Sequence, residues 1–306
     1  MEQSCSTTLT KKQKTNSTMK HAIIVGATSG IGKEVAKLLV QQGWHIGIAG
    51  RRTEALKTLQ TGAPTQIDIQ QIDVTDEDAP ARLQQLIERL GDMDLFLLSS
   101  GVGFQNRDLN PETELDTART NVEGFIRMVT CAFNYFKKRG CGHIAVISSI
   151  AGTKGLGVAP SYSATKRFQN TYIDALAQLS GMQHLNIHFT DIRPGFVATD
   201  LLRNGKYPML MQADSVARHI VNALHRKKRI AVIDLPDIGI LLADDSTMVM
   251  GKVAHKELIS YLHATKHKQS QHEKKFKTHS SYSRHRLMRR FHPTLPCRKQ
   301  HPGPGT

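Results

Sequence analysis

Long apolar runs are missing from this sequence. In a chain of 306 residues, of which 39% are hydrophobic, no run approaches the roughly 18 apolar residues that suggest a membrane-spanning helix. The chain begins with the polar stretch MEQSCSTTLTKKQKTNSTMK, which lacks the apolar core of a secretory signal. The sequence therefore predicts no membrane span and a cytoplasmic location.

Cysteine is scarce and scattered. The chain has four cysteines, and none of them forms a C-x-x-C pair: Cys5, Cys131, Cys141 and Cys297. Such spacing does not fit a disulfide framework, a zinc knuckle or a redox pair. We therefore predict no metal site.

Acidic residues are few, and the resulting net charge of +15 is unevenly distributed. From Arg226 to the end there are 17 Lys and Arg against 6 Asp and Glu, which leaves a surplus of only 4 in the part of the chain before Arg226. Residues 235–306 are predicted to be a basic, His/Arg-rich and largely disordered tail without specific nucleic-acid binding. Two other interpretations stay open: a nucleic-acid-binding tail, and a chain end that is not the ancestral one.

Strand and helix patterns alternate between Lys20 and Asp234, after a polar stretch (1–19) that is predicted to be disordered. Short apolar runs predict seven strands: residues 21–26, 45–50, 65–74, 94–100, 143–149, 185–192 and 229–234. Amphipathic helices are predicted over 31–43, 53–60, 78–91 and 215–226. This order predicts an α/β domain (20–234) with a doubly wound, three-layer α/β/α architecture and a parallel sheet of about seven strands.

A glycine-rich segment, GATSGIG, follows the first predicted strand and opens the first helix. Its glycines, Gly26, Gly30 and Gly32, allow a tight turn and a close backbone approach. The helix beyond them presents unpaired N–H groups that suit a phosphate. A dinucleotide site is therefore predicted, and a glycine-rich turn without a ligand is the alternative.

The second predicted strand ends in two arginines, Arg51 and Arg52, where a site that prefers NAD has an acidic residue. Two guanidinium groups suit a 2′-phosphate, so NADP(H) is the predicted cofactor and NAD(H) remains possible. Solvated arginines are the alternative. Asp73 and Val74, at the end of the third strand, are predicted to frame an adenine unless Asp73 caps the following helix.

Four polar side chains follow one another along the chain in a recognisable order. Tyr162 and Lys166 lie four positions apart, on one face of a predicted helix. Ser149 ends the strand before this helix, and Asn121 lies on a helical stretch further upstream. Ser148 is chemically equivalent to its neighbour, but the spacing to Tyr162 favours Ser149.

These residues, in this order and with the glycines, resemble the short-chain dehydrogenase/reductase family over Lys20 to Asp234. The resemblance implies a Rossmann-like subunit that transfers a hydride between a nicotinamide and a carbonyl or alcohol, as a homodimer or homotetramer. It also implies that Lys166 binds the nicotinamide ribose and that Asn121 holds a water that links Lys166 to solvent.

A tyrosine, with a pKa near 10, is a poor acid–base catalyst at neutral pH unless its phenolate is favoured. The Lys166 charge is expected to lower the pKa of Tyr162, which would then give a proton to a carbonyl oxygen or take one from an alcohol. Ser149 is expected to hydrogen-bond that oxygen. Local structural roles are the alternatives: Ser149 bonded to an amide at the strand end, Asn121 bonded to backbone, and Thr199 capping a helix.

The expected cofactor contacts lie along the carboxyl ends of the strands. Pro194, Gly195 and Thr199 resemble the family segment that contacts the nicotinamide carboxamide and the pyrophosphate of the cofactor. The full predicted set is Gly26, Thr28, Ser29, Gly30, Ile31, Gly32, Arg51, Arg52, Asp73, Val74, Ser100, Gly101, Tyr162, Lys166, Pro194, Gly195, Val197 and Thr199. Two positions depart from the family pattern. Ser99-Ser100-Gly101 stands where the family often has Asn-Ala-Gly, and Ser29 stands where many NADP-preferring members have a basic residue.

The segment after Thr199, DLLRNGKYPMLMQADS, resembles the part of the family that covers the substrate. Its apolar side chains favour a small-molecule, hydrophobic substrate, or else they pack on the core. The predicted function is an NADP-dependent oxidoreductase. A catalytically silent nucleotide-binding or regulatory protein and a nucleic-acid binder are the alternatives.

Overall fold

The computed structural model describes residues 20–202, 210–233, 241–243 and 247–249. The chain divides into two units, Met1–Leu235 and Pro236–Thr306. The predicted N-terminal extension, most of the predicted basic tail, and residues 203–209 of the predicted substrate cover lie outside the described residues.

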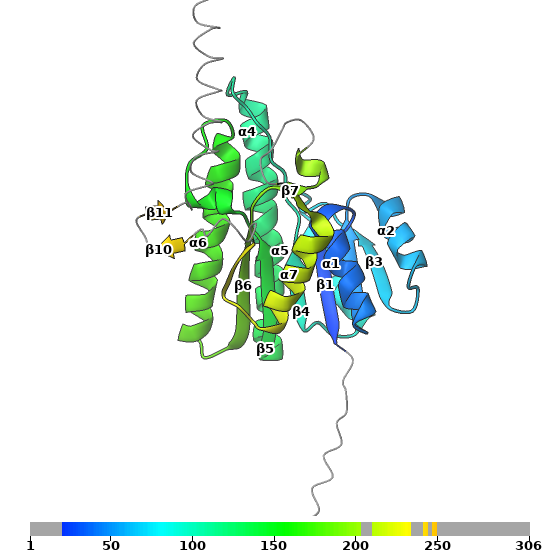
Figure 1. The fold of residues 1–306 in the computed structure, drawn as a ribbon. Helices are drawn as coiled ribbons and strands as arrows, with labels where there is room; N and C mark the ends of the chain where they lie inside the picture. The colour runs from blue at the N-terminus through cyan, green and yellow to red at the C-terminus, as the bar shows by residue number, and fades with distance from the viewer. Residues whose placement is uncertain (1–19, 203–209, 234–240, 244–246, 250–306) are drawn as a thin grey trace, which may run out of the picture. The chain divides into compact units, whose positions relative to one another are not determined.

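A seven-stranded sheet, parallel throughout, forms the centre of the first unit (Figure 1). Its strand order is β3-β2-β1-β4-β5-β6-β9. The strands are β1 (His21–Val25), β2 (His45–Gly50), β3 (Ile67–Gln71), β4 (Leu95–Leu98), β5 (Cys141–Ile147), β6 (Asn186–Pro194) and β9 (Ile230–Ile233). The seven predicted strands and the parallel sheet are confirmed.

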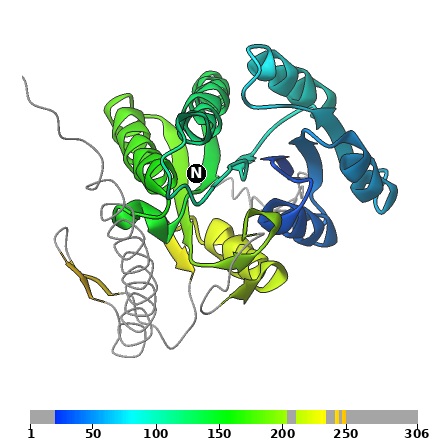
Figure 2. The same cartoon turned by 90° about the horizontal axis from the view of Figure 1, so that it is seen from above.

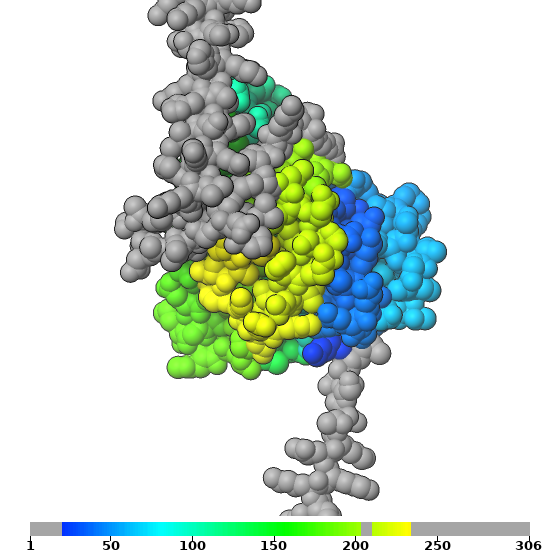
Figure 3. Space-filling model, viewed as in Figure 1, coloured from blue at the N-terminus to red at the C-terminus, as the bar shows by residue number. Residues whose placement is uncertain are grey.

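Helices cover both faces of this sheet. The main helices are α1 (Gly30–Gln41), α2 (Thr53–Thr61), α3 (Ala79–Leu90), α4 (Pro111–Ala118), α5 (Phe125–Arg139), α6 (Pro160–Met182) and α7 (Ala213–His225). Helices α1 and α7 lie side by side in front of the sheet in Figure 1, while α5 and α6 lie behind it, and Figure 2 shows the same two layers from above. Figure 3 shows α1 and α7 on the exterior of the front face.

Side-chain alternation along the strands explains the two cores. On β1, Ala22 and Ile24 belong to the cluster under α1 and α7, whereas Ile23 and Val25 belong to the cluster under α3 and α5. Because both faces are covered, every one of these residues is buried, which is typical of a parallel sheet. None of the described helices is long and apolar enough to cross a membrane.

The chain changes direction at β1. It runs outward from β1 through β2 to β3 and then returns to β4 on the other side of β1. The connections that follow β1 and β4 therefore leave the sheet in opposite directions, and open α/β sheets bind their ligands in a crevice at such a point, at the carboxyl end of the strands. The glycine-rich turn and Ser99-Ser100-Gly101 both lie at this point.

Shorter elements surround this carboxyl edge. They are η1, a π-helical turn (Arg119–Gly124), the 3-10 turns η2 (Ile150–Thr153) and η3 (Asp200–Leu202), and a small parallel pair, β7 (Val197–Ala198) with β8 (Met211–Gln212). In the second unit, β10 (Leu241–Ala243) pairs antiparallel with β11 (Thr247–Val249).

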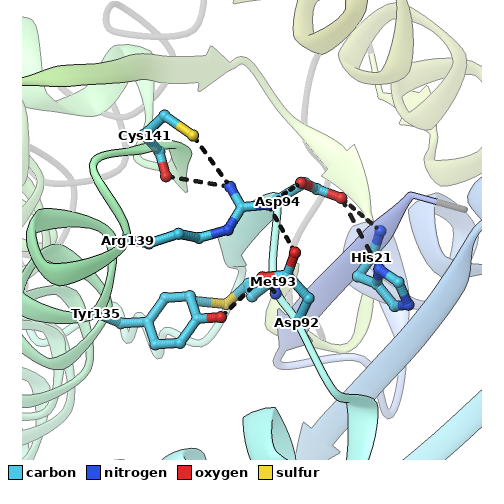
Figure 4. Close-up of polar contacts among 7 residues, drawn as sticks. All are labelled: His21, Asp92, Met93, Asp94, Tyr135, Arg139 and Cys141. Carbon is cyan, nitrogen blue, oxygen red and sulfur yellow. Dashed lines mark hydrogen bonds and ion pairs between the residues drawn. The ribbon is translucent and has the colours of Figure 1, made fainter. Parts of the chain in front are cut away.

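A cluster of charged side chains lies at the opposite end of the sheet, where the strands begin (Figure 4). Arg139, at the end of α5, donates to Asp92 at 2.7 Å and to Asp94 at 2.6 Å, just before β4. Asp94 also accepts from the backbone of His21, which begins β1, and Asp92 accepts from the Tyr135 hydroxyl. The cluster therefore links α5 to the starts of two central strands.

The Arg139→Met substitution keeps the apolar stem but removes these bonds, so we expect it to lower the free energy of unfolding by about 2 kcal/mol. Burial raises the pKa of Asp92, but bonds from Arg139 and Tyr135 outweigh it and hold that pKa below its ordinary value. A carboxyl group whose pKa is lowered in the folded state adds stability at pH values above its pKa in the unfolded state, about 4. This contribution is lost as the pH falls through the pKa of the folded state.

Urea unfolding from pH 7 down to pH 3 measures the difference in the free energy of unfolding between the wild type and Arg139→Met. It should shrink on acidification, and Arg218→Met, which removes an exposed pair with Asp214 on α7, should cost less than about 0.5 kcal/mol. Equal losses for the two variants would contradict a special role of the Arg139 cluster.

Candidate active site

The glycine-rich turn after β1 packs against the end of β4 with no room for a side chain. Gly26 has a φ of +95°, and a Cβ at this position would lie 2.5 Å from the backbone nitrogen of Ser100. At Gly32 a Cβ would overlap the Gly26 carbonyl oxygen. The turn therefore places backbone, rather than side chains, at the crevice between β1 and β4.

A hollow of about 490 Å³ opens beside the start of α1. Ser29, the N-cap residue, makes no side-chain bond to the helix backbone, so it leaves the first-turn N–H groups without a side-chain cap. Gly30, Lys33 and Thr199 also line the hollow. Lys33 was not predicted from the sequence, although it directly follows the glycine motif and adds positive charge.

Arg52 extends from the end of β2 to the glycine-rich turn. Its guanidinium donates to Ser29 Oγ at 2.6 Å and to Thr28 Oγ1 at 3.1 Å, and it pairs with Asp200 of η3 at 3.3 Å. Arg51 lies 3.9 Å from Asp73 and is mostly exposed. The two guanidinium groups therefore stand at the carboxyl end of β2, held by half-buried partners and by the exposed Asp200.

Asp73 does not cap α3, since its carboxylate accepts from the backbone and hydroxyl of Thr75 at 3.0 and 2.8 Å, inside the turn after β3. Val74, beside it, is buried against Gly124 of η1.

The remaining predicted cofactor residues also lie at the carboxyl edge. A Cβ on Gly30 would lie 3.0 Å from Thr199 Cγ2, and Gly195 donates to the Ile233 carbonyl. Val197 is buried in β7, and Ile31 packs on the core under α1.

Tyr162, Ser149 and Lys166 meet at the end of β5. The Ser149 hydroxyl accepts from the Ala151 backbone at 3.0 Å and lies beside the Tyr162 hydroxyl, where it favours the phenolate, and the Lys166 ammonium lies 5.7 Å from the centre of the Tyr162 ring. Ser148 has other partners: its hydroxyl donates to Asp191 of β6 and accepts from Asn170 of α6 in a buried group. Of the two adjacent serines, the one that lies beside Tyr162 is therefore Ser149, which the spacing favoured.

Asn121 lies in the π-helical turn η1 and is fully buried. Its amide accepts from Val102 N at 2.9 Å and donates to Val102 O at 2.7 Å, so it fixes the loop that follows β4. It also donates to Thr165 Oγ1, one residue before Lys166. A Cβ on Gly101 would lie 3.3 Å from Asn121 Oδ1 and 3.5 Å from Lys166 Nζ. All four predicted catalytic residues are therefore within one neighbourhood.

Burial sets the ionisation of this group. Burial raises the pKa of Tyr162, and the hydrogen bond from Ser149 opposes that rise. Burial lowers the pKa of Lys166 to about 8, although the negative charge of Asp191 opposes the shift. Lys166 is thus still largely charged at neutral pH and loses its charge within the weakly alkaline range.

Two further residues support the group and were not predicted. Glu114 of α4 accepts from the backbone and hydroxyl of Ser161 at 2.9 and 2.5 Å and so caps the start of α6 from another helix. Gln169 contacts both Lys166 and Asn121. No set of three or more His, Cys, Asp or Glu side chains suited to a metal ion occurs in the part of the chain that the structure describes.

The sequence profile named short chain dehydrogenase matches residues 20–207. The chain belongs to this family. Among its relatives, an "uncharacterized oxidoreductase" of Myxococcus xanthus is 31% identical over 194 residues, which cover 61% of this chain and 76% of that protein. The glycine betaine reductase ATRR of Emericella nidulans is 30% identical over 239 residues, 71% of this chain but only 18% of that much longer protein.

Solved structures share the fold of this short-chain dehydrogenase. An actinorhodin polyketide ketoreductase with NADPH has a TM-score of 0.63 at 24% identity and covers 71% of this chain and 96% of its own. A 3-ketoacyl-(acyl-carrier-protein) reductase from Brucella melitensis complexed with NADH has a TM-score of 0.64 at 23% identity, covering 70% and 96%. At these identities the likeness concerns the fold.

Gly26→Ala should cost about 3 kcal/mol of unfolding free energy or more, because its Cβ meets backbone as well as a positive φ. Gly43→Ala is the matched control: its φ is +79°, but a Cβ there meets nothing within 4 Å, so only the conformational cost of about 1 kcal/mol applies. Urea unfolding of both variants tests this, and equal costs would show that Ser100 gives way.

Proposed function

We propose that this short-chain dehydrogenase transfers a hydride between NADP(H) and a carbonyl or alcohol substrate. The observation that carries the proposal is the convergence of Ser149, the Tyr162 hydroxyl and Lys166, whose ammonium lies 5.7 Å from the centre of the Tyr162 ring. A protein that only binds a nucleotide needs no proton donor of this kind at the carboxyl edge.

The crevice fits a dinucleotide. Gly26 and Gly32 leave no space for a side chain, so backbone can approach the pyrophosphate closely, and the uncapped start of α1 offers N–H groups to it. Ser29, Gly30, Lys33 and Thr199 line the hollow at this point. When bound, the nicotinamide supplies or accepts the hydride at the substrate carbon.

Arg51 and Arg52 are proposed to select NADP(H) over NAD(H). Besides the bonds of Arg52 to Thr28 and Ser29, the arginines form ion pairs with Asp73 and Asp200, in which each guanidinium is more than half exposed. Such pairs contribute only about 0–1 kcal/mol, so a 2′-phosphate can replace them at low cost. A phosphate also offers both arginines charged hydrogen bonds with good geometry.

Tyr162 acts as the general acid and base in this proposal. In reduction its hydroxyl would donate a proton to the carbonyl oxygen, and in oxidation it would take the proton of the alcohol. Ser149 would hydrogen-bond the same oxygen and stabilise its developing charge.

Lys166 supports this chemistry through its charge and would also bind the nicotinamide ribose. The ammonium lies 5.7 Å from the centre of the Tyr162 ring, and a nearby positive charge favours the phenolate. This acts in the same direction as the Ser149 bond and against the burial of Tyr162.

An apolar substrate is consistent with the side chains near Tyr162. A Cβ on Gly103 would lie 2.6 Å from the Tyr162 ring, so the loop after β4 passes over it, and Phe104 on that loop is 49% exposed. Phe196, which follows Gly195, is another exposed aromatic residue. Exposed aromatic side chains around a polar centre suit a hydrophobic carbonyl compound.

Titration with NADPH and NADH, followed by nicotinamide fluorescence and a panel of ketones and aldehydes, tests the activity. Tyr162→Phe removes only the hydroxyl, so we expect kcat to fall at least about 100-fold with little change in cofactor affinity. Tyr172→Phe, on the same helix, is the control and should stay near wild type. Normal turnover by Tyr162→Phe would refute the acid–base assignment, and cofactor binding without any turnover would favour a nucleotide sensor.

The Arg51→Ala and Arg52→Ala double variant tests cofactor choice. It should raise the Kd for NADPH at least about 100-fold, because two charged hydrogen-bonding groups are lost, and change the Kd for NADH by less than about threefold. NADH is the internal control. Equal weakening of both cofactors would show that the arginines do not recognise the 2′-phosphate.

A further inference from the structure

Gln169 is a buried polar residue next to the reacting groups. It lies three residues after Lys166 on α6, which places both side chains on one face of the helix. Gln169 is 1% exposed and Lys166 is 4% exposed. A long amide side chain in such a position costs free energy unless both ends of the amide find partners.

Both ends do find partners, and these partners belong to the proposed catalytic group. Gln169 Oε1 accepts from Lys166 Nζ at 3.0 Å, and Gln169 Nε2 donates to the Asn121 backbone carbonyl at 2.9 Å. Lys166 Nζ makes a second bond, at 3.1 Å, to the Ile147 carbonyl at the end of β5. The ammonium is therefore held between β5 and the π-helical turn η1.

The π-helical turn explains why the Asn121 carbonyl meets another helix. Such a turn replaces the regular i to i−4 bonding by i to i−5 bonding and locally widens the helix. In η1 the Asn121 side chain fixes the loop at Val102, while its carbonyl accepts from Gln169 on α6. Asn121 thus orients the loop after β4 with its side-chain amide. Its backbone carbonyl orients Lys166 indirectly, because it holds Gln169, which accepts from Lys166.

We propose that Gln169 is the positioning residue for Lys166, and that its amide supplies the link between Lys166 and Asn121 that the family resemblance assigns to a water. This inference rests on the proposed function for its effect on turnover. An amide accepts at its oxygen and donates at its nitrogen without passing a proton between them. Gln169 therefore holds the charged lysine and does not relay its proton.

The charged groups around Lys166 determine how strongly Gln169 affects the ionisation of this lysine. Tyr162 lies on the same helix, and Asp191 on β6 favours the charged lysine. Arg193 pairs with Asp191 at 2.7 Å and withdraws part of that support. The β5 and η1 sides present neutral groups, the Ile147 carbonyl and the Gln169 amide. Loss of the Gln169 oxygen should therefore weaken the charged form directly.

The experiment measures the pKa of Lys166 with and without the amide, by NMR of the ε-carbon in 13C-lysine-labelled full-length protein. The wild-type value is expected near 8. Gln169→Leu should lower it by about one unit, because an acceptor of the ammonium is lost, and Gln169→Glu should raise it by about one unit or more. Lys166→Arg assigns the signal, and Gln178→Leu, on the exposed part of α6, is the control.

The same variants are then assayed for kcat/KM against pH. The alkaline limb should move in the same directions as the lysine pKa, with little change in KM. A Lys166 pKa that is unchanged in the Leu and Glu variants would overturn the proposal. If Gln169→Leu does not fold, the near-isosteric Gln169→Glu still decides it. The NMR titration needs no substrate, so an inactive wild type would refute the proposed function and leave the role of Gln169 to be judged separately.

Discussion

The close contact between the turn after β1 and the end of β4 is the constraint on which the rest of the site depends. Gly26 lies so close to the Ser100 backbone that no side chain fits between them. This contact holds together the two strands at which the chain reverses its direction through the sheet, and it leaves the crevice lined by backbone. The start of α1, the arginines after β2 and the residues after β4 all take their positions from it.

Near this site, buried polar side chains bond mainly to one another. Asn121, Lys166 and Gln169 form one connected set, and Ser148, Asn170 and Asp191 form another between β6 and α6, in which only the Asn170 Oδ1 lacks a partner among the described residues. A buried polar group without a partner is costly, so each set fixes its members in one arrangement. The second set acts on the first through charge, because Asp191 favours the charged form of Lys166.

Sequence patterns predicted the sheet well because strand and helix periodicities are local. The seven strands, the glycine-rich turn and the grouping of Ser149, Tyr162 and Lys166 follow from short segments whose order is diagnostic. Gln169 and Glu114 escaped prediction because their partners lie 48 and 47 residues away along the chain. The π-helical turn at Asn121 also has no sequence signature, since its segment shows an ordinary helical pattern. Asp73 bonds Thr75 in a local turn, so the alternative that it caps α3 is wrong, whereas its contact with an adenine stays a prediction.

The charged cluster at Arg139 affects which parts of this protein can tolerate amino-acid substitutions. It clamps α5 to the starts of β1 and β4, at the end of the sheet far from the crevice. The cluster thus stabilises one end of the strands, while the proposed chemistry takes place at the other. Since most substitutions cost stability, a reserve located away from the crevice lets the loops at the carboxyl edge accumulate changes before the fold is lost. New specificities can arise there while the amino end preserves the register of the sheet.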